Sequence, residues 1–152
     1  MKQLRDARGI SILYITHDLA TAYQVADTIL VLYRAAVVEA GEVEAVIRRP
    51  QHPYTQLLIG AVPRVSTVRN WGADDRKAEP ATASAGCRFA DRCPAVLPQC
   101  HVDAPPLYRT QRGRAAACFR LAEHPPLPAE QLDQILTPGP ATPTEVLVHS
   151  AS

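Results

Sequence analysis

Two groups of residues in this sequence of 152 residues combine types and spacings that could do chemistry. The first is the polar triplet Thr16, His17 and Asp18, which directly follows the apolar, β-branched residues 10–15. If residues 10–15 form a buried strand, the triplet lies at its carboxyl end, where open α/β sheets bind their ligands. We therefore predict that His17 donates to a phosphate oxygen or acts as an acid or base, while Asp18 fixes the loop. The alternative is a surface histidine followed by a helix cap.

The second group is the four cysteines, Cys87, Cys93, Cys100 and Cys118. Disulfides are rare in a reducing cytosol, and zinc usually takes two cysteines spaced two to four residues apart, a pair that this sequence lacks. An iron–sulfur cluster accepts four thiolates at variable spacing. Six arginines against two aspartates lie between residues 85 and 120, and they would offset the negative charge of such a centre. We predict an iron–sulfur cluster, with zinc, or reduced or disulfide-linked structural cysteines, as the alternatives.

Hydrophobic periodicity predicts the elements that must position these residues. Residues 10–15 are almost continuously apolar, as in a strand buried on both faces of a parallel sheet. Asp18 is a suitable cap for a helix that starts at Leu19. The predicted elements, in chain order, are a strand at 10–15, a helix at 19–26, strands at 28–33 and 36–40, and helices at 43–49 and 54–62.

The second and third predicted strands should form a hairpin that turns near Arg34, with Gly41 closing the pair. The run His52-Pro53-Tyr54-Thr55 is interpreted as a helix start, with Pro53 in the first turn and Tyr54 packing. One strand and a hairpin cannot enclose a buried parallel strand at residues 10–15. We therefore expect the chain to be a piece of a larger α/β domain.

Composition divides the chain. None of its 14 prolines precedes Pro50, and eleven fall from Pro80 onward. A net charge of +1 gives no field to attract nucleic acid, so no nucleic-acid partner is expected. Apolar runs are too short to span a membrane and the N-terminus lacks a secretory pattern, so we expect a cytosolic protein. The predicted zones are α/β structure at 1–63, a linker at 64–84, a four-cysteine module at 85–121, and a proline-rich acidic tail at 122–152.

Several motifs together resemble one family. Residues 9–19, 25–32 and 38–41 resemble the end of an ABC-transporter ATP-binding subunit. Residues 49–58 and 61–63, which include His52-Pro53-Tyr54-Thr55, are similar to the C-terminal extension of the oligopeptide and dipeptide importer branch. The cysteine pattern extends this similarity to about residue 121. One departure is Ala35, where the family usually has glycine, and it weakens the expectation of a tight turn.

This resemblance implies a partial P-loop NTPase sheet of the ABC ATPase type, followed by a small irregular extension. It implies that His17 is the switch histidine that contacts the γ-phosphate of ATP, with Asp18 beside it, and that ATP binds with Mg²⁺ in the full-length subunit. It also implies a four-iron four-sulfur cluster on Cys87, Cys93, Cys100 and Cys118. The implied partners are transmembrane permease subunits and a second ATP-binding subunit, at the inner face of the cell membrane.

The nucleotide-binding motifs that precede the switch histidine in that family do not occur in this sequence. Its two lysines, Lys2 and Lys77, do not follow a glycine, so there is no phosphate-cradling Gly-Lys-Ser or Gly-Lys-Thr loop. We therefore expect a C-terminal fragment of a subunit that energises peptide uptake, and no ATP hydrolysis by this chain alone. The rival hypothesis is a free-standing four-cysteine metal-binding or iron–sulfur interaction module with no part in ATP chemistry.

Overall fold

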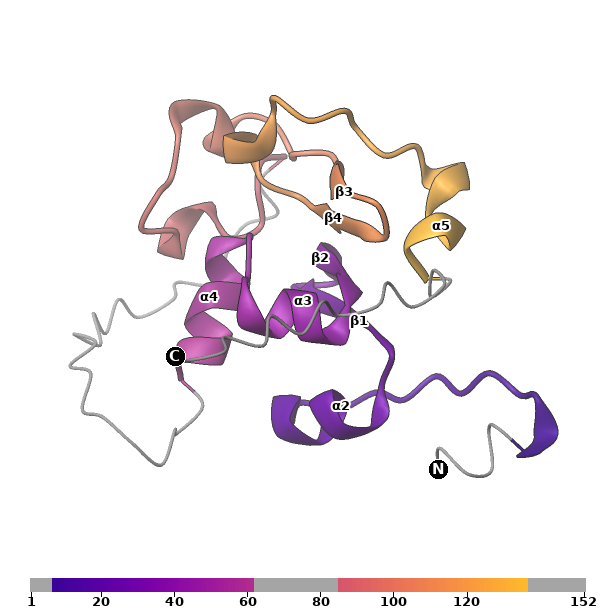
Figure 1. Cartoon of the computed structure of the whole chain (residues 1–152). Helices are drawn as coiled ribbons and strands as arrows, with labels where there is room; N and C mark the ends of the chain where they lie inside the picture. The colour runs from indigo at the N-terminus through magenta and orange to yellow at the C-terminus, as the bar shows by residue number, and fades with distance from the viewer. Residues whose placement is uncertain (1–6, 62–84, 137–152) are drawn as a thin grey trace, which may run out of the picture.

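The computed structural model describes residues 7–61 and 85–136. Their centre is a four-stranded sheet in the order β1-β2-β4-β3, in which each neighbouring pair runs antiparallel. Its strands are β1 (Thr28–Tyr33), β2 (Ala36–Glu42), β3 (Tyr108–Gln111) and β4 (Arg114–Ala116). With the helices around this sheet (Figure 1), the α/β class predicted from the sequence is confirmed.

The hairpin β1–β2 forms as predicted. Its turn residues Arg34 and Ala35 both have positive φ, 46° and 60°, which is the backbone of the tight turns that match strand twist. The turn therefore forms although Ala35 replaces a glycine. The prediction that Gly41 closes the second strand is wrong, because β2 continues to Glu42 and Gly41 pairs with Ile29 and Arg114. A side chain at Gly41 would lie 3.0 Å from the carbonyl oxygen of Gly113, so this glycine allows β4 to approach.

Helices and apolar side chains cover the sheet. Val31 and Val38 of the hairpin pack with Val46, while Ala40 and Ala115 form a second cluster with Leu127 and Ile135. No helix among the described residues is long and apolar enough to cross a membrane. The helices are α2 (Leu19–Val25), α3 (Val43–Arg48), α4 (Pro53–Gly60) and α5 (Asp133–Leu136), and the short 3-10 turns are Ala90–Arg92, Pro98–His101, Phe119–Leu121 and Ala129–Gln131.

The buried strand predicted at residues 10–15 is not found. These residues form neither helix nor strand, and they run outside the sheet before α2 (Figure 1). Leu13 and Ile15 remain 83% and 88% exposed. A strand needs a neighbour for its backbone N–H and C=O groups, and no described strand pairs with this segment. The parallel neighbours that this strand was expected to need do not occur among the described residues, so the apolar segment has no sheet to join.

The regions before and after the 62–84 segment share one sheet. Strand β4, from the predicted cysteine module, pairs with β2 of the hairpin through Glu39 and Ala116, Ala40 and Ala115, and Gly41 and Arg114. The start of the predicted tail also packs, since Ile135 is only 2% exposed in the second apolar cluster. The predicted linker at 64–84 and the tail beyond residue 136 lie outside the described residues. The zone limits drawn from composition stay a prediction.

Candidate functional site

His17 lies at the start of α2 and is exposed. Its neighbour Asp18 is the N-cap of that helix, and its Oδ1 accepts the N–H of Ala20 at 2.9 Å. The Asp18 backbone N–H in turn donates to Oγ1 of Thr16 at 3.0 Å. The hydroxyl of Thr21 donates to Asp18, and this bond, ahead of the N–H of Ala20, lowers the pKa of the carboxyl group. Asp18 therefore holds the loop as an anion, and His17 beside it is exposed.

All four cysteines are free thiols; Cys100 and Cys118 are buried, and Cys87 and Cys93 are partly buried. Burial raises the pKa of Cys87, Cys93 and Cys118. The Cys100 thiol raises each of these pKa values further, Cys87 also raises those of Cys93 and Cys118, and Cys93 raises that of Cys118. Every pair of these four thiols therefore includes one thiol that raises the pKa of the other. Cys87 and Cys100 are also joined through their backbones, because the N–H of Cys87 donates to the carbonyl of Cys100 at 2.8 Å. The structure thus brings Cys87 next to the backbone of Cys100.

Gathering four thiols in a partly desolvated place disfavours their ionisation unless a cation offsets the charge. No three His, Cys, Asp or Glu side chains within 7–61 and 85–136 are placed to hold a single metal ion. Zinc requires its sulfurs about 2.3 Å from one centre. The described arrangement of the thiols therefore gives no support to the predicted metal site.

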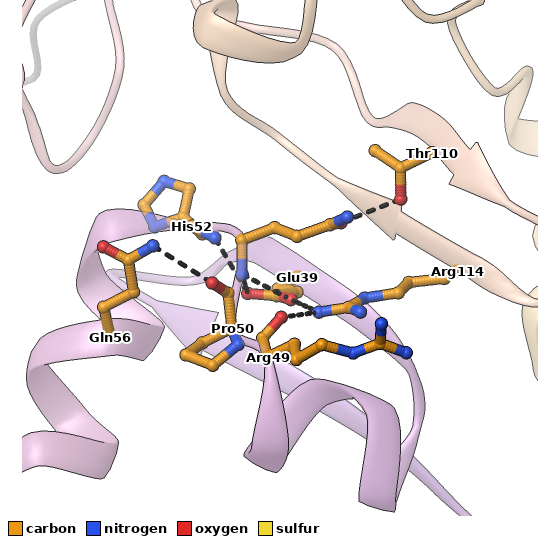
Figure 2. Close-up of polar contacts among 8 residues, drawn as sticks. Glu39, Arg49, Pro50, His52, Gln56, Thr110 and Arg114 are labelled. Atoms are coloured by element: carbon orange, nitrogen blue, oxygen red, sulfur yellow. Dashed lines mark hydrogen bonds and ion pairs between the residues drawn. The ribbon is translucent and has the colours of Figure 1, made fainter.

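A buried polar network, which local sequence patterns did not predict, joins β2, β4 and the turn before α4. Glu39 on β2 and Arg114 on β4 are 0% and 3% exposed, and Arg114 Nη2 lies 2.9 Å from Glu39 Oε1 (Figure 2). The Arg114 guanidinium also donates to the carbonyl of Arg49. The Glu39 carboxylate further accepts the backbone N–H groups of Gln51, at 3.0 and 3.2 Å, and of His52, at 2.9 Å. The turn before α4 is therefore bound to two strands at once.

The His52-Pro53-Tyr54-Thr55 run is a helix start, as predicted, with Pro53 at the first helical position. His52 caps α4 through Nδ1, which accepts the Tyr54 N–H at 3.0 Å. Burial lowers the pKa of His52 to about 4, so the ring is neutral at pH 7. Because Nδ1 accepts a hydrogen bond, the ring proton resides on Nε2. The run therefore serves as the N-terminal cap of α4 in this structure.

Aromatic rings join the helix start to the cysteine segment. The ring centroid of Phe89 lies 5.2 Å from that of Tyr33, 5.5 Å from that of Tyr54 and 5.9 Å from that of His52. Phe89 is 3% exposed and lies two residues after Cys87. The local sequence pattern does not single out Phe89, Glu39 or Arg114. One local signal could have pointed to the buried ion pair: Glu39 is a charged residue among the apolar residues of a strand.

The sequence was compared with protein families and with curated proteins. Residues 38–100 match the family model of the oligopeptide/dipeptide transporter C-terminal region, a stretch that contains Glu39, His52 and Phe89. By this match and its relatives, the chain is similar to the C-terminal part of the ATP-binding subunits of oligopeptide/dipeptide transporters. Among the curated relatives of the family, a protein of Brucella melitensis whose name describes a peptide import ATP-binding protein is 30% identical over 131 residues, which cover 81% of this chain and 39% of the relative.

A relative in Sinorhizobium fredii is named as a peptide ABC transporter ATP-binding protein. It is 35% identical over 127 residues, covering 79% of this chain and 37% of that protein. A protein of Brucella ovis named as a peptide import ATP-binding protein is 34% identical over 124 residues, which cover 79% of this chain and 39% of that protein. The chain thus spans about two fifths of the length of the relatives it matches. These matches favour the transporter family over the rival free-standing module, and the strand β4 that follows the first three cysteines is also part of the common sheet.

Proposed function

We propose that this chain is part of the ATP-binding subunit of a peptide-type ABC importer and helps to energise ATP-driven uptake of oligopeptides or dipeptides. The observation that carries the proposal is the match of residues 38–100 to the transporter C-terminal region. In this proposal the partners are transmembrane permease subunits and a second ATP-binding subunit. The site of action is the cytoplasmic face of the membrane.

His17 is the residue proposed to act on ATP. Its imidazole is exposed beside the N-cap of α2, so its N–H can donate to a γ-phosphate oxygen supplied from another part of the assembly. Bound ATP with Mg²⁺ supplies the phosphoryl group, whose developing charge positioned donors stabilise. Asp18 keeps the loop in place through its bonds to Ala20 and Thr21.

The test is uptake of a radiolabelled dipeptide and oligopeptide by the native host carrying His17→Ala at the chromosomal locus. We expect uptake to fall by about 100-fold or more, as when one transition-state donor is removed. The matched control is His101→Ala, which removes another exposed histidine outside the loop and should leave uptake unchanged. Normal peptide uptake by the His17→Ala strain would contradict the proposal.

We further propose that Cys87, Cys93, Cys100 and Cys118 hold a four-iron four-sulfur cluster. Support comes from the residue types alone: four cysteines and six arginines lie between residues 85 and 120, and the arginines would offset the negative charge of four thiolates. Anaerobic purification should give a brown protein that absorbs at about 400 nm and contains about four irons per chain. Each cysteine-to-serine variant should lose most of the iron. Purified protein with neither iron nor zinc would overturn a metal role for these cysteines.

A further inference from the structure

Cys87 and Cys100 lie on two segments of the chain that are hydrogen-bonded to each other. The Cys87 backbone N–H donates to the Cys100 carbonyl oxygen at 2.8 Å. Gly86, the residue before Cys87, approaches so closely that a Cβ built there would lie 2.3 Å from the same oxygen and 2.9 Å from the His101 carbonyl oxygen. The fold therefore makes direct neighbours of two cysteines that are 13 positions apart in the sequence.

The separation of these two backbone segments suits a disulfide bond. Residues joined by a backbone hydrogen bond between adjacent segments have Cα atoms about 5.5 Å apart, and a disulfide spans Cα atoms about 4.4 to 6.8 Å apart. The Cys100 sulfur accepts the Leu97 N–H at 3.4 Å, and because sulfur is a weak acceptor, this bond does not fix the thiol. Rotation of the two side chains can therefore join the sulfurs without a large movement of the backbone.

The other two cysteines lack such a backbone link to a cysteine within residues 85–136. The Cys93 N–H donates to the Ala90 carbonyl at 3.2 Å, and the Cys118 carbonyl accepts the Leu121 N–H at 2.9 Å. Both bonds belong to local turns. Since no three His, Cys, Asp or Glu side chains in the described ranges are placed to hold a single metal ion, the described thiols fit the chemistry of a pair better than a ligand set.

Both ends of the loop from Cys87 to Cys100 are anchored in the fold. Phe89, two residues after Cys87, is 3% exposed and packs edge-on against Tyr33, with ring centroids 5.2 Å apart. Cys100 is 7% exposed, and its N–H donates to the Leu97 carbonyl at 2.9 Å. An ordered backbone raises the effective concentration of one thiol at the other, so the folded chain should favour the disulfide more than the unfolded chain does.

We propose that Cys87 and Cys100 are a modification site, a thiol pair that a low-molecular-weight disulfide oxidises to a reversible disulfide bond in the metal-free chain. The thiolate of the partly buried Cys87 attacks one sulfur of the small disulfide, forms a mixed disulfide and releases one small thiolate. Cys100 then loses its proton to water, and its sulfur attacks the Cys87 sulfur and expels the second small thiolate. In sum, two protein thiols and one small disulfide become one protein disulfide and two small thiols. This inference does not rest on peptide transport, ATP or the iron–sulfur cluster.

The test measures the oxidation equilibrium of the full chain in glutathione redox buffers, after a chelator has removed metals. Burial raises the pKa of the Cys87 thiol and so slows its attack, and each sample is therefore left until the ratio of disulfide to dithiol is constant. The double variant Cys93→Ser with Cys118→Ser keeps the proposed pair. The matched control, Cys87→Ser with Cys118→Ser, keeps Cys93 and Cys100. Each variant is measured folded and in concentrated urea, by alkylation of free thiols and mass spectrometry.

We expect the equilibrium constant for the Cys87–Cys100 disulfide to be at least about tenfold higher in the folded chain than in urea, because folding holds the pair together. The control pair should show no such gain. In the wild-type chain, tandem mass spectrometry of the tryptic peptide 93–109 should place the bond from Cys87 at Cys100 and not at Cys93. This measurement needs no substitution, so it decides the question even if a double variant fails to fold. No gain on folding, an equal gain in the control pair, or a bond at Cys93 would overturn the inference.

Discussion

The buried ion pair between Glu39 and Arg114 should be a main determinant of stability, and Glu39→Gln tests it. Glutamine keeps the shape of the side chain and one oxygen acceptor but removes the negative charge. Arg114, 3% exposed, would then be a buried cation without its carboxylate partner. Breaking a buried pair from one side costs about 3 to 5 kcal/mol.

The backbone groups that bind Glu39 add to this cost. Its two oxygens accept the N–H groups of Gln51 and His52 as well as the guanidinium, so the new amide NH₂ of Glu39→Gln must face at least one donor. An unsatisfied buried donor costs about 1 to 3 kcal/mol. Because these costs overlap, we expect a loss of about 4 kcal/mol in the free energy of unfolding. That is a large part of the ~5 to 15 kcal/mol of a typical domain.

Urea denaturation followed by circular dichroism measures this loss, with Glu44→Gln as the matched control. Glu44 and Arg48 approach to 2.8 Å, as close as the buried pair, but their side chains are 55% and 66% exposed. Exposed pairs contribute little, so Glu44→Gln should leave stability nearly unchanged.

Removing both members of the buried pair separates charge from packing. The double variant Glu39→Gln with Arg114→Met leaves no buried cation, so it should be more stable than Glu39→Gln alone. A loss below about 1 kcal/mol for Glu39→Gln, as for surface pairs, would refute the reasoning. Strictly additive effects in the double variant would refute it equally.

Two further predictions concern the same region. The pKa of His52 falls from 6.5 to about 4 on folding, so between these pH values the unfolded chain binds more protons than the folded chain. The free energy of unfolding should therefore drop by about 3 kcal/mol as the pH falls from 6.5 towards 4. His52→Gln should remove this part of the pH dependence, measured by urea titrations at several pH values. Gly86→Ala would place a Cβ 2.3 Å from the Cys100 carbonyl oxygen and should destabilise the cysteine segment by about 1 to 3 kcal/mol. Gly113→Ala, which meets no atom within 4 Å but has a φ of +69°, should lower the thermal midpoint less.

Local patterns predicted the elements whose stabilising contacts are near in sequence. The strand Thr28–Tyr33 and the helix capped by Asp18 follow the prediction closely, because alternation, caps and turns depend on adjacent residues. The helix start at Pro53 was predictable for the same reason. Residues 10–15 were mispredicted because strand formation depends on a partner that periodicity cannot supply.

The candidate site was predictable as residue types but not as an arrangement. Cysteine and histidine were recognisable from their chemistry, yet nothing local indicated that Phe89 would pack against His52, Tyr33 and Tyr54. The alanine-rich strand β4 carries little strand propensity, so its place beside β2 was also hidden.

The sequence by itself determined the family resemblance, the hairpin, the capped loop at His17 and the presence of four thiols. Only the tertiary structure decided that Glu39 and Arg114, 75 positions apart, form one buried pair, and that the cysteine segment shares a sheet and an aromatic cluster with the His52 turn. The physical reason is that caps, turns and periodicity act over a few residues. Burial, ion pairing and ring packing depend on distances in space that folding alone sets.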